Sequence, residues 1–313
     1  MADNESLPEG KLFRRWKFSF FCVITFAVIN SSLYSSIAKA TLHRAQIDTL
    51  LRLPLESRIP FEPLFVWAYI SFWLLLILPF WIYSMPKQFK VTKILIRFFR
   101  QKLGLKGQIS WFFANLGIKF FGLIEDLTRF IFGEEDDEKV IRKARVQTFL
   151  AYLIVAIVSS ATYWFMPLVV PRNHISIEKI PGLTIKMLAF VWRSDLPDNT
   201  FPSQHASFSF LTFFIFNHLR AKPGWSESVF KLTKKKSIKR RISVVGLIFL
   251  IWAILIVLST FFVKQHIIAD AAAGMTLSYV AFKVGFSDKL YGWLSRAAKK
   301  VTAVFKKVFH LPE

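Results

Sequence analysis

Cysteine is almost absent from this chain, since Cys22 is the only one among 313 residues. A single cysteine excludes an intramolecular disulfide and any metal site built from several cysteines. The sequence also lacks an internal repeat and a flexible linker, so we expect a single domain over residues 1–313. Acidic residues are scarce: 20 stand against 42 lysines and arginines, which gives a net charge of +22. Because the basic residues collect between apolar runs, we attribute this charge to membrane topology and expect no nucleic-acid partner.

Long apolar runs dominate the rest of the sequence. Hydrophobic residues make up 54% of it, and several runs reach the roughly 20 residues that a helix needs to cross a bilayer. The pattern predicts an all-α fold, a polytopic helical bundle surrounded by membrane lipids. We place six transmembrane helices at residues 18–38, 65–83, 149–169, 203–219, 244–263 and 266–286.

Basic residues lie in alternate segments between these helices. They gather in the N-terminal tail, after the second helix, at residues 231–241 and in the C-terminal tail. Positively charged segments remain in the cytoplasm, so both termini are expected there. Residues 39–63 and 170–202 and the turn at 264–265 then lie on the extracytoplasmic side of an inner or plasma membrane.

Two features of the sequence allow other topologies. A basic start followed by an apolar run is compatible with a cleaved signal peptide, but the run is longer than the ~7–15 residues of a typical signal. Residues 111–132 could form a seventh crossing, but their charged side chains would each cost about 2.5–3.5 kcal/mol in hydrocarbon. We instead expect residues 86–145 to form an interfacial amphipathic segment between helices two and three.

The first candidate functional motif, residues 201–205 (Phe-Pro-Ser-Gln-His), opens the fourth helix. Pro202 suits the first turn of a helix, where free backbone N–H groups and the positive end of the helix dipole favour an anion. The Ser203 hydroxyl could bind a phosphate there, and His205 could donate a proton to it. Alternatively, Ser203 is only a helix cap and His205 an interfacial polar residue.

The second candidate motif places His266 and Asp270 four residues apart, on one face of the sixth helix. A carboxylate bonded to one ring nitrogen leaves the other nitrogen free for nucleophilic attack. A metal site is the rival use of these residue types. The basic residues nearby fit an anion better, and we expect neither a metal nor another cofactor.

Three basic residues are expected at the same extracytoplasmic boundary, namely Arg172, Arg193 and Lys264. A converging set of cations suits phosphoryl oxygens. Each could instead extend to lipid headgroups as an anchor. Asp195 and Asn199, in the segment before the first motif, either contact an acceptor or cap the loop.

These residues resemble the phosphatidic acid phosphatase type 2 superfamily of membrane phosphatases and phosphotransferases over roughly residues 163–274. The superfamily's middle motif, Pro-Ser-x-His, matches residues 202–205. Its last motif, Ser-Arg-x5-His-x3-Asp, matches Ser259, His266 and Asp270 at the same spacing. The resemblance implies a catalytic core within these residues.

The resemblance also implies a role for each matched residue. His266 would be the nucleophile that forms a phosphohistidine, Asp270 its orienting partner, and His205 the acid that protonates the leaving oxygen. Ser203 would bind the phosphate. To these roles we add Gln204 and the three basic residues named above as candidate phosphate ligands.

The chain departs from the superfamily at two cation positions. The arginine of the last motif falls on Thr260, and Phe165 occupies the lysine position of the first motif, Lys-x6-Arg-Pro, of which only Arg172 remains. The sequence around the site is more similar to the branch that includes inositol phosphorylceramide synthase. In that branch Lys264 would substitute for the lost arginine.

We therefore expect an integral membrane enzyme that hydrolyses a lipid phosphate or diphosphate at the extracytoplasmic face through a phosphohistidine. A phosphotransferase that moves a phospho-headgroup between lipids is the first alternative, and sequence alone does not separate the two outcomes. A non-catalytic binder or transporter of anionic lipids is the second. A transporter would be expected to carry paired broken helices, of which the sequence shows little sign.

Overall fold

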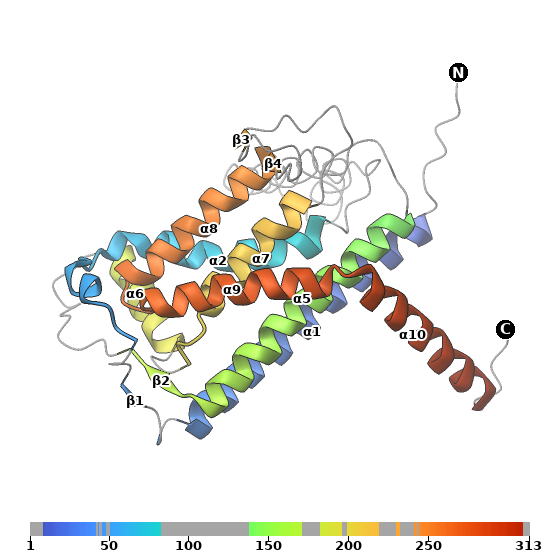
Figure 1. Cartoon of the computed structure of the whole chain (residues 1–313), viewed down its shortest axis with the longest axis horizontal. Helices are drawn as coiled ribbons and strands as arrows, with labels where there is room; N and C mark the ends of the chain where they lie inside the picture. The colour runs from blue at the N-terminus through green and yellow to red at the C-terminus, as the bar shows by residue number, and fades with distance from the viewer. Residues whose placement is uncertain are drawn as a thin grey trace, which may run out of the picture.

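Figure 1 shows the fold of the protein in a computed structural model. It describes residues 9–41, 43, 46–47, 51–82, 138–170, 182–195, 199–218, 230–231, 241–242 and 244–308. The α-helices of these residues are α1 (Glu9–Thr41), α2 (Val66–Ile82), α5 (Glu138–Phe165), α6 (Leu183–Ser194), α7 (Gln204–His218), α8 (Val244–Phe262), α9 (Ile268–Gly285) and α10 (Asp288–Val308). The described residues also contain two 3-10 helices, η2 (Pro54–Arg58) and η3 (Pro63–Phe65). Their short strands are β1 (Gln46–Ile47), β2 (Leu168–Val169), β3 (Phe230–Lys231) and β4 (Arg241–Ile242).

The helices confirm the predicted all-α class and overlap the six predicted ranges. The apolar runs become α1, α2, α5, α7, α8 and α9, because a run of this length satisfies its own backbone hydrogen bonds only as a helix. Two further helices were not predicted. α6 lies within the segment expected as an outer loop and is too short for a membrane span, whereas α10 follows the last predicted span.

Membrane-spanning character is clearest in two of these helices. Pro63–Phe80 and Arg142–Phe165 are long and apolar enough to cross a bilayer, and Gly246–Phe262 is a shorter apolar helix. Of the described residues, no other helix passes this test, so the prediction of six crossings is not confirmed. In the predicted interfacial segment, residues 86–137 lie outside the described part of the chain, and residues 138–145 begin α5 instead.

α7 is the central helix of the bundle. It packs against α2, α5, α8 and α9, and its side chains Phe208, Leu211, Ile215 and Phe216 are almost fully buried. The Phe216 ring stacks on Phe249 of α8 at a centroid distance of 3.9 Å. A helix that is buried on all sides is held by its neighbours in position and rotation, so residues at its ends are placed accurately.

One end of the bundle collects the segments that surround the two histidine motifs. α6 and the pair β1–β2 lie at this end (Figure 1). The strands pair in parallel, with Gln46 opposite Leu168 and Ile47 opposite Val169, and so tie the residues after α1 to those after α5. The N-terminal ends of α7 and α9 meet here as well, because Ser203 N donates to Asp270 O at 3.0 Å.

Candidate active site

Close contact between α7 and α9 brings the two histidine motifs together. The contact depends on Gly274, since a Cβ atom there would lie 2.5 Å from the backbone oxygen of Ser203 and 2.9 Å from the Ala206 side chain. Glycine at this position therefore allows the two helices to approach along their first turns.

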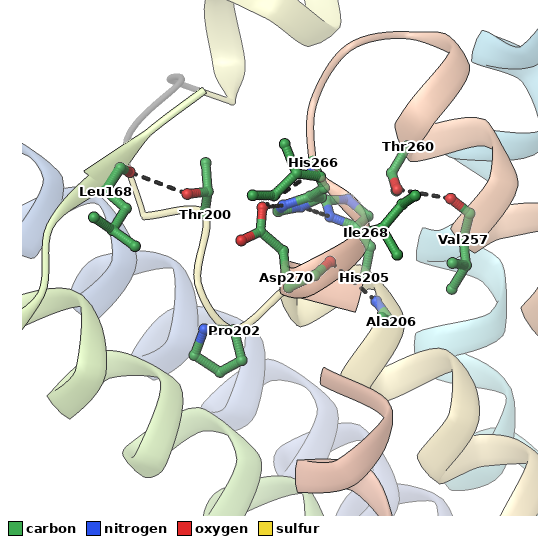
Figure 2. Close-up of polar contacts among 12 residues, drawn as sticks. Leu168, Thr200, Pro202, His205, Ala206, Val257, Thr260, His266, Ile268 and Asp270 are labelled. Carbon is green, nitrogen blue, oxygen red and sulfur yellow. Dashed lines mark hydrogen bonds and ion pairs between the residues drawn. The ribbon is translucent and has the colours of Figure 1, made fainter. Parts of the chain in front are cut away.

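His266 stands between an acid and a second histidine (Figure 2). Its Nδ1 atom lies 3.4 Å from Asp270 Oδ2, and its Nε2 atom lies 3.4 Å from His205 Nδ1. The Asp270 side chain is fully buried and also accepts from Ile267 N at 3.1 Å. With its proton on Nδ1, His266 donates to this fixed carboxylate and keeps the Nε2 lone pair directed at His205.

His205 is held by aromatic rings on α2. Tyr69 and Phe72 each lie 4.4 Å from it between ring centroids. These residues are almost one helical turn apart on α2 and so share one face of it. Packing of both rings against the imidazole restricts its rotation and keeps its Nδ1 atom facing His266.

The turn before α9 sets the position of His266. The backbone oxygen of Thr260 accepts from Gln265 N at 2.8 Å and from His266 N at 3.3 Å. Lys264 has a φ of 56°, and its ammonium donates to the backbone oxygen of Ile59 at 2.6 Å. Thr260, at the position where the superfamily has an arginine, thus contributes its backbone oxygen to this turn. The Lys264 side chain extends to Ile59, in the segment before α2.

Glu56 of η2 also contacts this turn. Its side chain is buried and accepts from Ile268 N at 2.8 Å, which satisfies a free donor at the start of α9. Arg52 approaches the other carboxylate oxygen at 3.9 Å. Burial, with the charge of Arg52, lowers the pKa of Lys264, and the charge of Glu56 opposes this effect. The segment after α1 therefore stabilises the turn between α8 and α9 through the hydrogen bonds of Glu56 and Ile59.

A cavity of about 300 Å³ opens beside the two histidines. Side chains of α1, α2, α5 and α6 line it, together with Asp195, Asn199, Gln204, His205 and His266. Aromatic and aliphatic side chains form much of the wall, and of the described residues in the lining none is a lysine or an arginine. This volume lies at the lower end of the range for small-molecule pockets and suits a headgroup or a phosphoryl group.

Asp195 is the second carboxylate of the cavity. The Tyr34 hydroxyl donates to its Oδ1 atom at 2.5 Å, and the Tyr69 hydroxyl donates to its Oδ2 atom. Burial by itself raises the pKa of Asp195, but the charge of His205, the two hydroxyls and His266 outweigh it and hold the pKa below its usual value. Asp195 is therefore an anion at neutral pH.

Five of the predicted site residues line the cavity: His205, His266, Gln204, Asp195 and Asn199. Asp270 lies directly behind His266. The Gln204 amide exchanges hydrogen bonds with Asn30 of α1 at 3.2 and 3.5 Å, and Asn199 donates to the backbone oxygen of Tyr34 at 3.1 Å.

Three further predicted site residues are not among the described residues that line the cavity. Ser203 is buried, and its hydroxyl accepts from Ala206 N at 3.3 Å, as a helix cap does. Lys264 and Arg193 are not part of the described cavity lining, and Arg193 is exposed on α6. Arg172 lies outside the described residues.

Sequence reasoning missed the tyrosines and the amide that α1, α2 and α5 contribute. Tyr34 and Tyr69 bind Asp195, Asn30 binds Gln204, and the Tyr163 hydroxyl donates to the backbone oxygen of Pro202 at 2.7 Å. A usable signal was present, because Asn30 and Tyr34 are polar residues one turn apart within an apolar run and so share a face of α1. Of the described residues, no group of three His, Cys, Asp or Glu could hold a metal ion.

Comparisons with known proteins bear on part of the chain. No curated protein and no solved structure matches the chain. Residues 146–291 match the family model of the PAP2 superfamily, a range that runs from α5 through α9 into α10 and includes both histidine motifs. The match supports the assignment of this part of the chain to the PAP2 superfamily of phosphatases and phosphotransferases.

Proposed function

We propose that the protein is an integral membrane phosphatase that hydrolyses a lipid phosphate or diphosphate through a phosphohistidine intermediate. The observation that carries this proposal is the row of side chains Asp270–His266–His205 at the edge of the cavity, in which each partner lies 3.4 Å from a nitrogen of His266. An oriented nucleophile with an acid on its other side is what phosphoryl transfer to a side chain requires.

In the first chemical step, His266 Nε2 attacks phosphorus and the bond from phosphorus to the leaving oxygen breaks. The His205 Nδ1 proton passes to that oxygen, so the lipid alcohol leaves neutral. In the second step, His205 accepts a proton from water as the water oxygen attacks the phosphohistidine. The P–N bond breaks, phosphate is released and both histidines return to their first state.

Entry of substrate has to separate the two imidazoles. A contact of 3.4 Å between His266 Nε2 and His205 Nδ1 leaves no room for a phosphoryl group. The cavity lies next to this contact and gives the headgroup a place from which to enter. Catalytic contacts are often rearranged in the absence of substrate, so this geometry fits a resting site.

We assign phosphate binding to Gln204 and Ser203 at the start of α7 and to the cations Lys264, Arg193 and Arg172. Lys264 would have to leave Ile59 for this role, since its ammonium is bonded there at 2.6 Å. Membrane attachment is supported by the two spans, and the uneven distribution of basic residues supports an extracytoplasmic site.

A phosphotransferase is the second candidate. The cavity wall contains apolar side chains such as Phe72, Trp73 and Phe190, which would limit the access of water to the phosphohistidine. A lipid alcohol would then take the phosphoryl-linked headgroup, as the similarity to the inositol phosphorylceramide synthase branch suggests.

The deciding experiment measures phosphate release by purified protein in detergent with a chelator present. The substrates are phosphatidic acid, phosphatidylglycerol phosphate and a polyprenyl diphosphate. A parallel assay supplies a phosphodiester donor and a radiolabelled lipid acceptor. We expect His266→Ala to lose at least about 10³-fold in rate and to lose the acid-labile, alkali-stable phosphoprotein seen after rapid quenching.

His218→Ala is the matched control, because His218 lies at the opposite end of α7 and should leave the rate unchanged. Labelled acceptor without free phosphate would indicate the transferase. Turnover that survives in His266→Ala, or silence on every substrate, would overturn the catalytic proposal in favour of a lipid binder.

A further inference from the structure

His205 is linked to a buried anion through one tyrosine. The ring of Tyr69 packs against the His205 imidazole at 4.4 Å between centroids, with a 34° angle between the planes. The hydroxyl of the same tyrosine donates to Asp195 Oδ2. Tyr69 therefore fixes the imidazole with its face and the carboxylate with its hydroxyl, and both groups line the cavity.

A second tyrosine holds the same carboxylate from the other side. Tyr34 donates to Asp195 Oδ1 at 2.5 Å, and its ring packs edge-on against Tyr163 at 6.0 Å. Asp195 follows the last residue of α6, and its backbone N–H donates to Val191 O at 2.8 Å. Contacts from α1, α2 and α6 thus hold an anion close to the histidine pair, a costly arrangement that calls for a role.

We propose that Asp195 is a positioning residue for His205, and that its negative charge raises the proton affinity of the imidazole that transfers its Nδ1 proton to the leaving oxygen. This inference rests on the function proposed above. Asp270 serves His266 as a direct partner, whereas Asp195 serves His205 through its charge and through Tyr69. Asp270 fixes the ring orientation of the nucleophile, whereas Asp195 raises the proton affinity of the acid.

Several titratable groups face His205. Tyr69 approaches from α2, Asp195 from the end of α6 and His266 from the turn before α9, while Tyr34 of α1 and Tyr163 of α5 line the same cavity. The tyrosines are neutral in the range where histidine titrates. Among the groups that face His205, Asp195 is therefore the charged one whose removal should change the proton affinity of His205 most directly.

The test compares Asp195→Asn with the wild type on two substrates. Phosphatidic acid has a poor alkoxide leaving group that needs the proton, whereas p-nitrophenyl phosphate has a leaving group that departs without one. We expect Asp195→Asn to lower kcat on phosphatidic acid by roughly 10-fold or more, within the range of acid catalysis. The alkaline limb of the pH–rate profile should move down by about one pH unit. The initial burst of p-nitrophenol, which reports only the first step, should change in rate by less than about 3-fold, as in His205→Ala.

Two further variants separate charge from structure. Tyr34→Phe removes one hydrogen bond but keeps the anion, so its alkaline limb should stay in place. Asp288→Asn removes a carboxylate at the start of α10, outside the cavity, and should behave as wild type on both substrates. Thermal unfolding in detergent shows whether each variant folds.

Equal losses on both substrates with an unmoved alkaline limb, in a folded Asp195→Asn protein, would overturn the inference. That result is distinct from failure of the proposed function. In the latter case wild type would be inactive on both substrates, or His266→Ala would retain its rate.

Discussion

Asp195 illustrates how a single residue combines burial with charge. Its carboxylate accepts from Tyr34 and Tyr69 and lies near the two histidines, and these interactions outweigh the cost of burial. The depressed pKa means that the folded protein binds this proton less readily than the unfolded chain does. By linkage, the ionised carboxylate contributes stability above the unfolded pKa, and this contribution disappears as the pH falls through the folded pKa.

This linkage predicts a pH-dependent difference in stability between wild type and Asp195→Asn. The wild type should have the higher unfolding temperature in detergent from about pH 7 to pH 5, with a nearly constant difference. The difference should shrink as the pH falls below the ordinary value of 3.8. Thermal unfolding followed by tryptophan fluorescence measures both proteins across this range. A difference that grows on acidification would show that the buried carboxyl is protonated in the folded state.

At the scale of elements, the contact between α7 and α9 decides whether the two histidines meet. Both helices begin at the same end of the bundle, and Ser203 N bonds to Asp270 O at 3.0 Å across their first turns. The bond joins the residue before α7 to the residue that orients His266. A small change in helix separation therefore alters the site directly.

Gly274→Ala should separate these helices. The added Cβ would lie 2.5 Å from the Ser203 backbone oxygen, which cannot rotate away. We expect a loss of about 1–3 kcal/mol in unfolding free energy and a loss of roughly 10–100-fold in activity as the histidines move apart. Phosphate release and thermal unfolding measure these effects.

Gly292→Ala is the control for helix propensity. Its Cβ would meet only the Arg296 side chain at 3.6 Å, so this variant should be as stable as wild type or more stable by about 0.5–1 kcal/mol. Unchanged activity and stability in Gly274→Ala would contradict the close contact of α7 and α9.

At the scale of the whole molecule, the arrangement across the membrane can be tested with single cysteines, because the chain has only Cys22. In a Cys22→Ala background, Ser57→Cys marks the site end of the bundle and Ala298→Cys marks α10; both positions are exposed. Six crossings predict that a membrane-impermeant maleimide labels Ser57→Cys in intact cells. It should label Ala298→Cys only after permeabilisation. The reverse pattern would place the histidine pair on the cytoplasmic face.

Local properties of the sequence were enough to predict the helices and the central residues of the site. Apolar runs predicted helices that overlap α1, α2, α5, α7, α8 and α9, because a long apolar segment satisfies its backbone within itself. The spacing of His266 and Asp270 predicted that both residues share one face of a helix, because four residues make about one helical turn. Each of these inferences depends on residues that are neighbours along the chain.

Contacts between distant segments required the folded structure. The sequence did not predict the hydrogen bond from Lys264 to Ile59. Tyr34 and Tyr69 reach Asp195 from helices more than 100 residues away in sequence. Such pairs depend on the rotation and separation of packed helices. Those are set by close packing of side chains over the whole bundle and leave no periodic mark in any one segment.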